Sequence, residues 1–158
     1  MNFIDKYNNK KNVRFPFFKK TLEIAHKRNI KIIVETGTAR GKTKFFFFKK
    51  INWKDGMSTL LFADFAKYVD GELHSCDLSK NNIENAKHFT KDYSSFTSFY
   101  IDDSINFLKS FPKKIDLLYL DSLDGHDSKL ASSHQLEEAK MSFNKLHDNS
   151  LVLLDDKG

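Results

Sequence analysis

The sequence predicts an α/β fold, in which a doubly wound parallel sheet carries helices on both faces. Short apolar runs alternate along the chain with longer amphipathic segments, and the runs are rich in β-branched or aromatic residues, as buried strands are. The runs cover residues 30–34, 72–76, 97–101, 115–120 and 151–154. Strands that alternate with helices pair in parallel through right-handed crossovers, so we expect a single domain over residues 1–158.

The amphipathic segments place apolar residues on one helical face. Before the first strand, Phe18, Leu22 and Ala25 predict an inward-facing helix within an N-terminal helical segment, residues 1–29. Later stripes with helical spacing are Leu61, Phe65 and Val69, then Ile83, Ala86 and Thr90, and finally Leu136, Ala139, Phe143 and Leu146. We expect these stripes to pack against the sheet.

Composition is that of a globular protein, with 40% apolar and 30% charged residues and a net charge of +5. This mild positive excess does not by itself predict a nucleic-acid partner. No apolar run approaches the roughly 20 residues that a membrane helix needs, and the N-terminus lacks a signal-peptide pattern. The single cysteine, Cys76, excludes an intramolecular disulfide and an all-cysteine zinc site, so a cytoplasmic protein is expected.

Acidic residues follow the predicted strands. They are Glu35, Asp77, Asp102 with Asp103, Asp121, and Asp155 with Asp156. In open α/β sheets, ligands bind in the crevice beyond the carboxyl ends of the strands. A single acid there is usually a turn or capping residue, but their repetition at one edge predicts a ligand site.

The loop after the first strand permits three nucleotide-binding interpretations. A phosphate-binding loop of nucleoside triphosphatases needs four residues between its glycines, whereas three separate Gly37 from Gly41. The dinucleotide fingerprint Gly-x-Gly-x-x-Gly is absent, and although the loop resembles the start of the short-chain dehydrogenase loop, Thr43 stands where the last glycine of that loop belongs. Both remain less favoured alternatives.

The third interpretation rests on Glu35 at the strand end, followed by Gly37 and Gly41. This pattern resembles the first motif of class I S-adenosylmethionine-dependent methyltransferases, with Ala39 in place of their usual second glycine. The resemblance runs from about residue 30 to residue 158. It implies a Rossmann-like sheet of strand order 3-2-1-4-5, and the usual helix and strands after the fifth strand are missing, so we expect a truncated or minimal form.

The resemblance also implies roles for single residues. Asp77 matches the acid that binds the ribose hydroxyls, Asp103 and Ser104 match the residues near the adenine, and Asp121 matches the acid beside the methyl donor. The implied S-adenosylmethionine-binding residues are Glu35, Thr36, Gly37, Thr38, Gly41, Asp77, Leu78, Asp103 and Ser104.

A finer resemblance, carried by residues 35–41 and 153–156, is to small-molecule O-methyltransferases that include sugar-modifying enzymes. It implies methyl transfer to a hydroxyl, with Asp121 and His126 as catalytic residues. It also implies a Mg²⁺ site made by Asp121, Asp155 and Asp156, because hard carboxylate oxygens suit that ion. The long spacing to His126 leaves open whether Asp121 or Asp124 is the ligand.

Residues 42–55 depart from the family pattern with five lysines, four consecutive phenylalanines and Trp53. The segment is interpreted as a lid over the cofactor, a packed excursion or a nucleic-acid surface, and these stay open. The apolar fifth strand predicts a second copy or another chain along its edge. A degenerate cofactor-binding or interaction module without turnover therefore stands as the alternative to an enzyme acting on a small-molecule acceptor.

Overall fold

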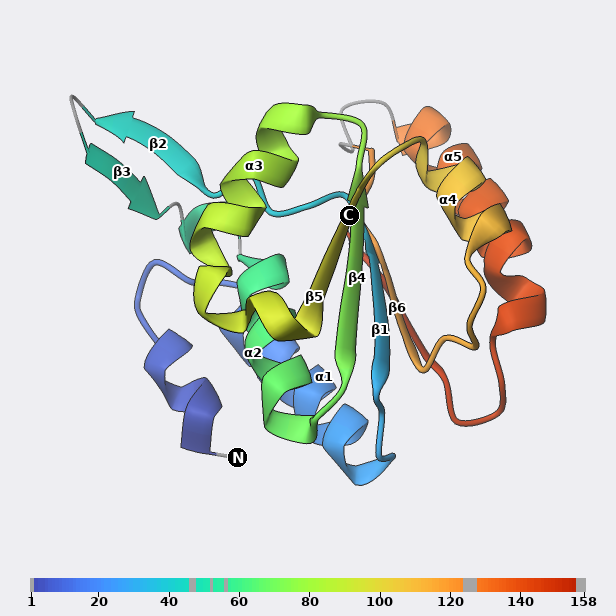
Figure 1. The fold of residues 1–158 in the computed structure, drawn as a ribbon, viewed down its shortest axis with the longest axis horizontal. Coiled ribbons are helices and arrows are strands. Elements are labelled where there is room, and N and C mark those ends of the chain that lie inside the picture. The colour runs from blue at the N-terminus through green and yellow to red at the C-terminus, as the bar shows by residue number, and fades with distance from the viewer. Residues whose placement is uncertain (1, 46–47, 52, 56, 124–127, 156–158) are drawn as a thin grey trace.

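The computed structural model describes residues 2–45, 48–51, 53–55, 57–123 and 128–155 (Figure 1). Its central sheet is parallel and has the order β5-β4-β1-β6-β7. The strands are β1 (Ile32–Thr36), β4 (Glu72–Asp77), β5 (Thr97–Ile101), β6 (Leu117–Leu120) and β7 (Leu151–Leu154). Counted along the chain, this is the predicted 3-2-1-4-5 order, so the fold class is confirmed.

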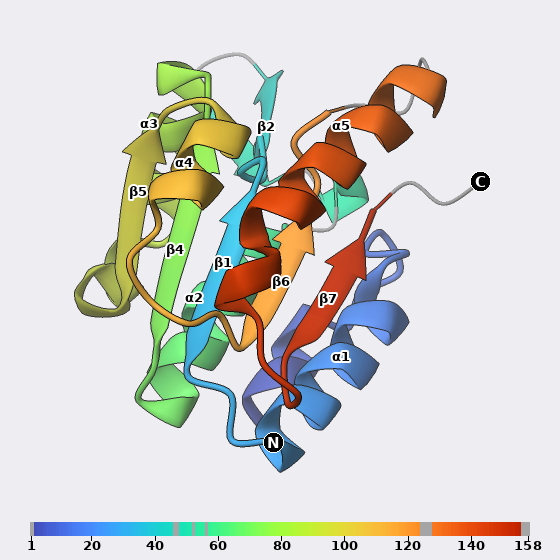
Figure 2. The same ribbon diagram turned by 90° about the vertical axis from the view of Figure 1, so that its right-hand side faces the viewer.

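Helices cover both faces of the sheet (Figures 1 and 2). One face carries α1 (Phe15–Lys27), α2 (Ser58–Val69) and α3 (Lys80–Phe89), and the other carries α4 (Ser104–Ser110) and α5 (Ser128–Ser142). Short 3-10 helices are η1 (Asn2–Tyr7), η2 (Trp53–Asp55), η3 (Lys91–Phe96) and η4 (Phe143–Lys145). No helix in the described ranges is long and apolar enough to cross a membrane.

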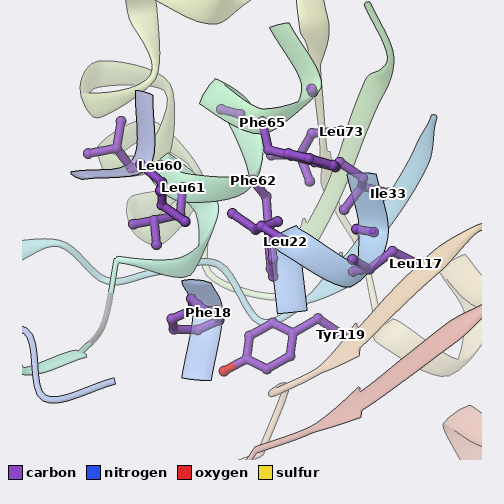
Figure 3. Packing of buried hydrophobic residues seen from close by; sticks show 14 of the residues in the cluster. Phe18, Leu22, Ile33, Leu60, Leu61, Phe62, Phe65, Leu73, Leu117 and Tyr119 are labelled. Atoms are coloured by element: carbon purple, nitrogen blue, oxygen red, sulfur yellow. The ribbon is translucent and has the colours of Figure 1, made fainter. Parts of the chain in front are cut away.

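Two hydrophobic clusters form the core, one on each face, because successive strand residues point to opposite sides. On β1, Ile33 belongs to the cluster under α1 and α2, whereas Val34 belongs to the cluster under α4 and α5. In the first cluster, the rings of Phe18, Phe62 and Tyr119 meet edge to face, with centroids 5.5–5.8 Å apart (Figure 3). This packing fixes Tyr119, whose hydroxyl reaches the carboxyl end of the sheet.

The predicted helical stripes are confirmed for α1, α2 and α3, where Ile83, Ala86 and Thr90 are all buried, but not for α5. Phe18, Leu22 and Ala25 are fully buried, as are Leu61 and Phe65.

Two residues expected to face inward from α5 and η4 are instead in contact with solvent. Leu136 is 56% exposed and Phe143 is 78% exposed, whereas Ala139 and Leu146 pack against the second cluster. The helix α5 ends at Ser142, and the 3-10 helix η4 begins at Phe143. Phe143 therefore does not continue the helical face on which Ala139 lies. The apolar residues of this segment therefore divide between core and surface.

The strands β2 (Lys42–Phe45) and β3 (Phe48–Ile51) pair in antiparallel fashion and project from the side of the domain that carries α3 (Figure 1). The first α-helix after β1 is α2, which begins at Ser58, after these two strands. After the strands, Trp53 is half-buried against the first cluster, with its ring centroid 6.1 Å from that of Tyr7. The end of this segment is therefore packed, while a lid function for residues 42–55 stays a prediction.

Candidate functional site

The carboxyl ends of the strands enclose two adjoining pockets. Register pairs Thr36 with Cys76 and with Leu120, so the loops that follow β1, β4 and β6 meet at one edge. The first pocket is strongly polar and is lined by residues that include Arg14, Gly37, Asp77, Asn82, Asp121 and Asp155. The second is a mainly apolar slot lined by residues that include Cys76, Leu78, Asp103, Ser104, Leu123 and His134. Gly37, Asp77 and Ser122 border both pockets, so the two form one continuous site.

Glu35 supports this site from below and lines neither pocket. Its carboxylate is fully buried and accepts hydrogen bonds from Ser58 (2.6 Å), Thr59 (2.7 Å) and Ser75 (2.6 Å). The Thr59 hydroxyl in turn accepts the backbone N–H of Ala39 at 2.8 Å. Glu35 thereby ties the start of α2 to the loop that contains Gly37 and Gly41.

Burial raises the pKa of Glu35 to about 7, although the three hydroxyls partly oppose this shift. The folded protein therefore binds a proton here more tightly than the unfolded chain does. Stability from this group is present at acidic pH and is lost as pH rises from about 4.5 to 7. We expect the difference in unfolding free energy between wild type and Glu35→Gln to change by about 3 kcal/mol across this range. Urea titrations at pH 5 and pH 8 measure it, and a pH-independent difference would contradict the assignment.

The glycines of the loop are required by their surroundings. Gly37 has φ +83°, and a Cβ there would lie 2.0 Å from the backbone oxygen of Asp121. Gly41 has φ +63°, and its Cβ would meet the ring of Phe89 at 2.2 Å. Only glycine combines this conformation with such close contact. Thr36, the last residue of β1, is buried and does not line either pocket.

Asp77 connects the loops on either side of the site. Its Oδ2 accepts hydrogen bonds from the backbone N–H and the hydroxyl of Thr38, both at 3.1 Å. Its Oδ1 accepts the N–H of Ser79 at 2.7 Å, and the amide of Asn82 contacts both oxygens at 3.1–3.2 Å. The carboxylate is therefore held in a fixed orientation at the junction of the two pockets. The next residue, Leu78, is 73% exposed beside the slot.

The far end of the slot is built by the start of α4 and by α5. Asp103 caps α4, because its Oδ1 accepts the N–H groups of Ile105 and Asn106 at 3.1 Å. The Ser104 hydroxyl lies 3.0 Å from Nε2 of His134. His134 was not among the residues predicted from the sequence. Its spacing of four residues from Glu138 was the one available signal.

Asp121 and Asp155 meet at the opposite end, above β6 and β7. Their carboxyl groups are hydrogen-bonded to each other, and the Arg14 guanidinium lies 2.5 Å from Asp155 Oδ2. The Tyr119 hydroxyl donates to Asp121 Oδ2 at 3.3 Å. Burial and the nearby Asp155 charge raise the pKa of Asp121 well above its usual range. The pair therefore combines a proton-binding carboxyl group with an ion-paired one.

Three predicted or alternative site residues, His126, Asp124 and Asp156, lie outside the described residues. Within the described ranges, no group of three or more His, Cys, Asp or Glu side chains is placed to hold a metal ion. Asp121 and Asp155 lie together at one end of the site, and Arg14, from the start of α1, joins them, which no pattern in the sequence indicates.

The comparisons with known proteins agree with this geometry. The fold matches methyltransferase PaMTH1 of Podospora anserina, solved with bound SAH (19% identity, TM-score 0.62, 86% of this chain and 50% of that chain). It also matches a methyltransferase from Geobacter sulfurreducens (14%, TM-score 0.60, 87% and 58%). A third match is SMU.1697c, a putative methyltransferase from Streptococcus mutans in complex with SAH (10%, TM-score 0.57, 87% and 70%). The chain thus spans 50% and 58% of the first two structures.

The search of curated proteins found no match. The family model described as a methyltransferase domain matches residues 34–157, which is most of the chain and includes every loop of the site described above. The chain belongs to this methyltransferase domain family.

Proposed function

We propose that the two pockets bind S-adenosylmethionine and that the protein transfers its methyl group to a hydroxyl of a small molecule, with sugars as the first candidates. The observation that carries the proposal is the position of Asp77 and Asp121. They stand at the ends of β4 and β6, the two strands that flank β1, and line the same pocket. One carboxylate suits a ribose, and the other suits the hydroxyl that is methylated.

The residues present fit such a cofactor. A carboxylate accepts the two hydrogen bonds that cis ribose hydroxyls donate, and at Asp77 these would replace contacts that the Thr38 hydroxyl and the Asn82 amide make without ligand. The slot beside it has mainly apolar walls, which suit a flat purine. At the junction of the pockets, Ser122 Oγ is buried without a hydrogen-bond partner in the described part of the chain, so it is available to a ligand.

The cofactor supplies a methyl group on a positively charged sulfur. The O–CH₃ bond forms as the S–CH₃ bond breaks, the sulfur keeps the bonding pair, and the hydroxyl proton passes to the carboxyl pair. Asp121 and Asp155 orient the hydroxyl and receive its proton, while Arg14 and Tyr119 hold the pair in place. Most of the acceleration comes from this positioning, and proton removal adds about 10²- to 10⁴-fold.

Methyl transfer from labelled S-adenosylmethionine to a panel of polyhydroxylated acceptors tests the proposal. Because the pKa of Asp121 is raised, its ionised form grows as pH rises above neutrality, and we expect the rate to rise with it. Asp121→Asn should lower kcat by about 100-fold or more and remove the pH dependence.

The alternative, a binding module without turnover, is distinguished by the same assay. Binding of S-adenosylmethionine without transfer to any acceptor, on a folded protein, would favour the module. Transfer at equal rates by wild type and Asp121→Asn would leave methyl transfer in place but remove Asp121 from it.

The described residues do not support the predicted Mg²⁺ site. Asp121 and Asp155 provide two of the three expected carboxylates, but Arg14 already supplies positive charge to Asp155. The third, Asp156, lies outside the described residues. No step of the proposed reaction therefore involves a metal ion.

We expect methyl transfer to persist after treatment with EDTA. Addition of roughly 5–10 equivalents of Mg²⁺ should shift the melting temperature by less than about 1 °C. Loss of activity in EDTA that Mg²⁺ restores would reinstate the metal prediction. In that case, the response of Asp155→Asn to Mg²⁺ shows whether the ion binds this carboxylate.

A further inference from the structure

We propose that His134, oriented by the buried carboxyl group of Glu138, selects adenine over other purines at the slot. This inference rests on the proposed function, because it concerns how the same site recognises the base of its cofactor. His134 is thereby a specificity-determining residue that touches the ligand, and Glu138 is a positioning residue that acts through it.

The position of His134 places its imidazole in the wall of the slot. His134 lies on α5 and lines the slot together with Ser104, the first residue of α4. Its Nε2 lies 3.0 Å from the Ser104 hydroxyl and 3.7 Å from Glu138 Oε1. The base-binding wall thus contains a short polar chain from Glu138 through His134 to Ser104, in a slot whose other walls are mainly apolar.

The side chain of Glu138 is fully buried, and neither carboxyl oxygen has a hydrogen-bond partner within the described ranges. A buried carboxyl group without hydrogen bonds destabilises the folded protein. A leucine at this position of α5 would avoid that desolvation cost. The imidazole of His134, one helical turn away, lies within 3.7 Å of Glu138 Oε1. The residue is therefore better explained by its effect on His134 than by helix packing.

The hydrogen-bonding properties of Glu138, His134 and Ser104 determine which donors and acceptors the slot offers a ligand. A carboxylate accepts hydrogen bonds only, so Glu138 favours the form of His134 that carries a hydrogen on Nε2. Ser104 Oγ then accepts from Nε2, and its own hydrogen is free to be donated. The other ring nitrogen, Nδ1, is an acceptor. Because His134 lines the slot, we infer that its Nδ1 faces the ligand, so that the wall offers one donor from Ser104 and one acceptor from His134.

This pattern matches one edge of adenine, which has an exocyclic amino donor beside a ring-nitrogen acceptor. Hypoxanthine has the opposite arrangement, a carbonyl oxygen beside a ring N–H, so its carbonyl oxygen would face the Nδ1 acceptor of His134 and leave that nitrogen unpaired. Buried polar groups left unpaired strongly disfavour a wrong ligand. The site should thus discriminate between two bases of nearly identical size.

The experiment compares the affinity for S-adenosylhomocysteine with that for S-inosylhomocysteine, using calorimetry at pH 7.5. We expect wild type to prefer the adenine compound by at least about tenfold. In His134→Leu and in Glu138→Gln, the preference should fall below about threefold. His26→Leu, an exposed histidine at the far end of α1, is the matched control and should keep the wild-type ratio.

Glu138→Leu separates positioning from packing. We expect a higher melting temperature than that of wild type, because an unpaired buried carboxyl group is removed, together with loss of the base preference. A higher melting temperature with an unchanged ratio would overturn the role of Glu138. Equal binding of the two compounds by wild type, or an unchanged ratio in His134→Leu, would overturn the inference. Failure of wild type to bind S-adenosylhomocysteine at all would instead contradict the proposed function.

Discussion

Gly37→Ala is expected to lower the free energy of unfolding by about 3 kcal/mol or more. An alanine at φ +83° is strained, and its Cβ would lie 2.0 Å from the backbone oxygen of Asp121, which cannot move without displacing β6. Because Gly37 also donates its N–H to the Cys76 carbonyl at 2.8 Å, relief of the clash disturbs the loops after three strands. Urea unfolding measures the loss of stability.

The matched control is Gly71→Ala, at the opposite end of β4. A Cβ there would lie 2.4 Å from the Lys31 carbonyl oxygen, so this variant should also be destabilised. Gly71 is far from both pockets, however, and the folded fraction should keep its affinity for S-adenosylmethionine. Equal stability of wild type and Gly37→Ala would show that the Gly37 loop does not pack as described. If Gly37→Ala and Gly71→Ala lost affinity for S-adenosylmethionine equally, the loss would reflect general destabilisation and not the position of Gly37.

Asp77→Ala is expected to weaken binding of S-adenosylmethionine by at least about tenfold, because charge-assisted hydrogen bonds contribute about 1.5–3 kcal/mol each. The variant loses the ribose contact and also the anchor that holds Thr38 and Asn82. Calorimetric titration measures the affinity, and circular dichroism verifies the fold. Asp92→Ala, at an exposed acid of η3, controls for the loss of one negative charge. Unchanged affinity in Asp77→Ala would remove this residue from the cofactor site.

Much of the fold could be predicted from sequence because the central strands β1, β4 and β6 are buried on both faces. Continuous apolar runs such as residues 117–120 and 151–154 have few alternatives in a chain of this length. The helical stripe of α1 was equally informative, since Phe18 and Leu22 both reach the core. The β2–β3 pair was not predicted, because its lysines and phenylalanines follow no clear strand alternation.

The candidate site was predictable where a residue stands at a strand end. Asp77 and Asp121 lie in the pockets because parallel strands bring their carboxyl ends to one edge. Glu35 also stands near a strand end, but its carboxylate is buried below the loop, where it accepts hydrogen bonds from three hydroxyls of α2 and β4.

Arg14 and His134 enter the site from helices distant in the sequence, and no local pattern indicates such contacts. Arg14 meets Asp155 although the two residues are 141 positions apart in the sequence, so only the tertiary fold brings them together. His134 reaches the slot because α5 packs beside α4. Tertiary packing, and not periodicity, therefore decides which polar residues complete the site.

A crystal structure of the protein grown with S-adenosylhomocysteine tests the central claim most directly. We expect the adenine in the slot beside Ser104 and His134, the ribose hydroxyls within hydrogen-bonding distance of Asp77, and the sulfur in the polar pocket facing Asp121. Density for the ligand at another place on the protein, or with its ribose away from Asp77, would contradict the account.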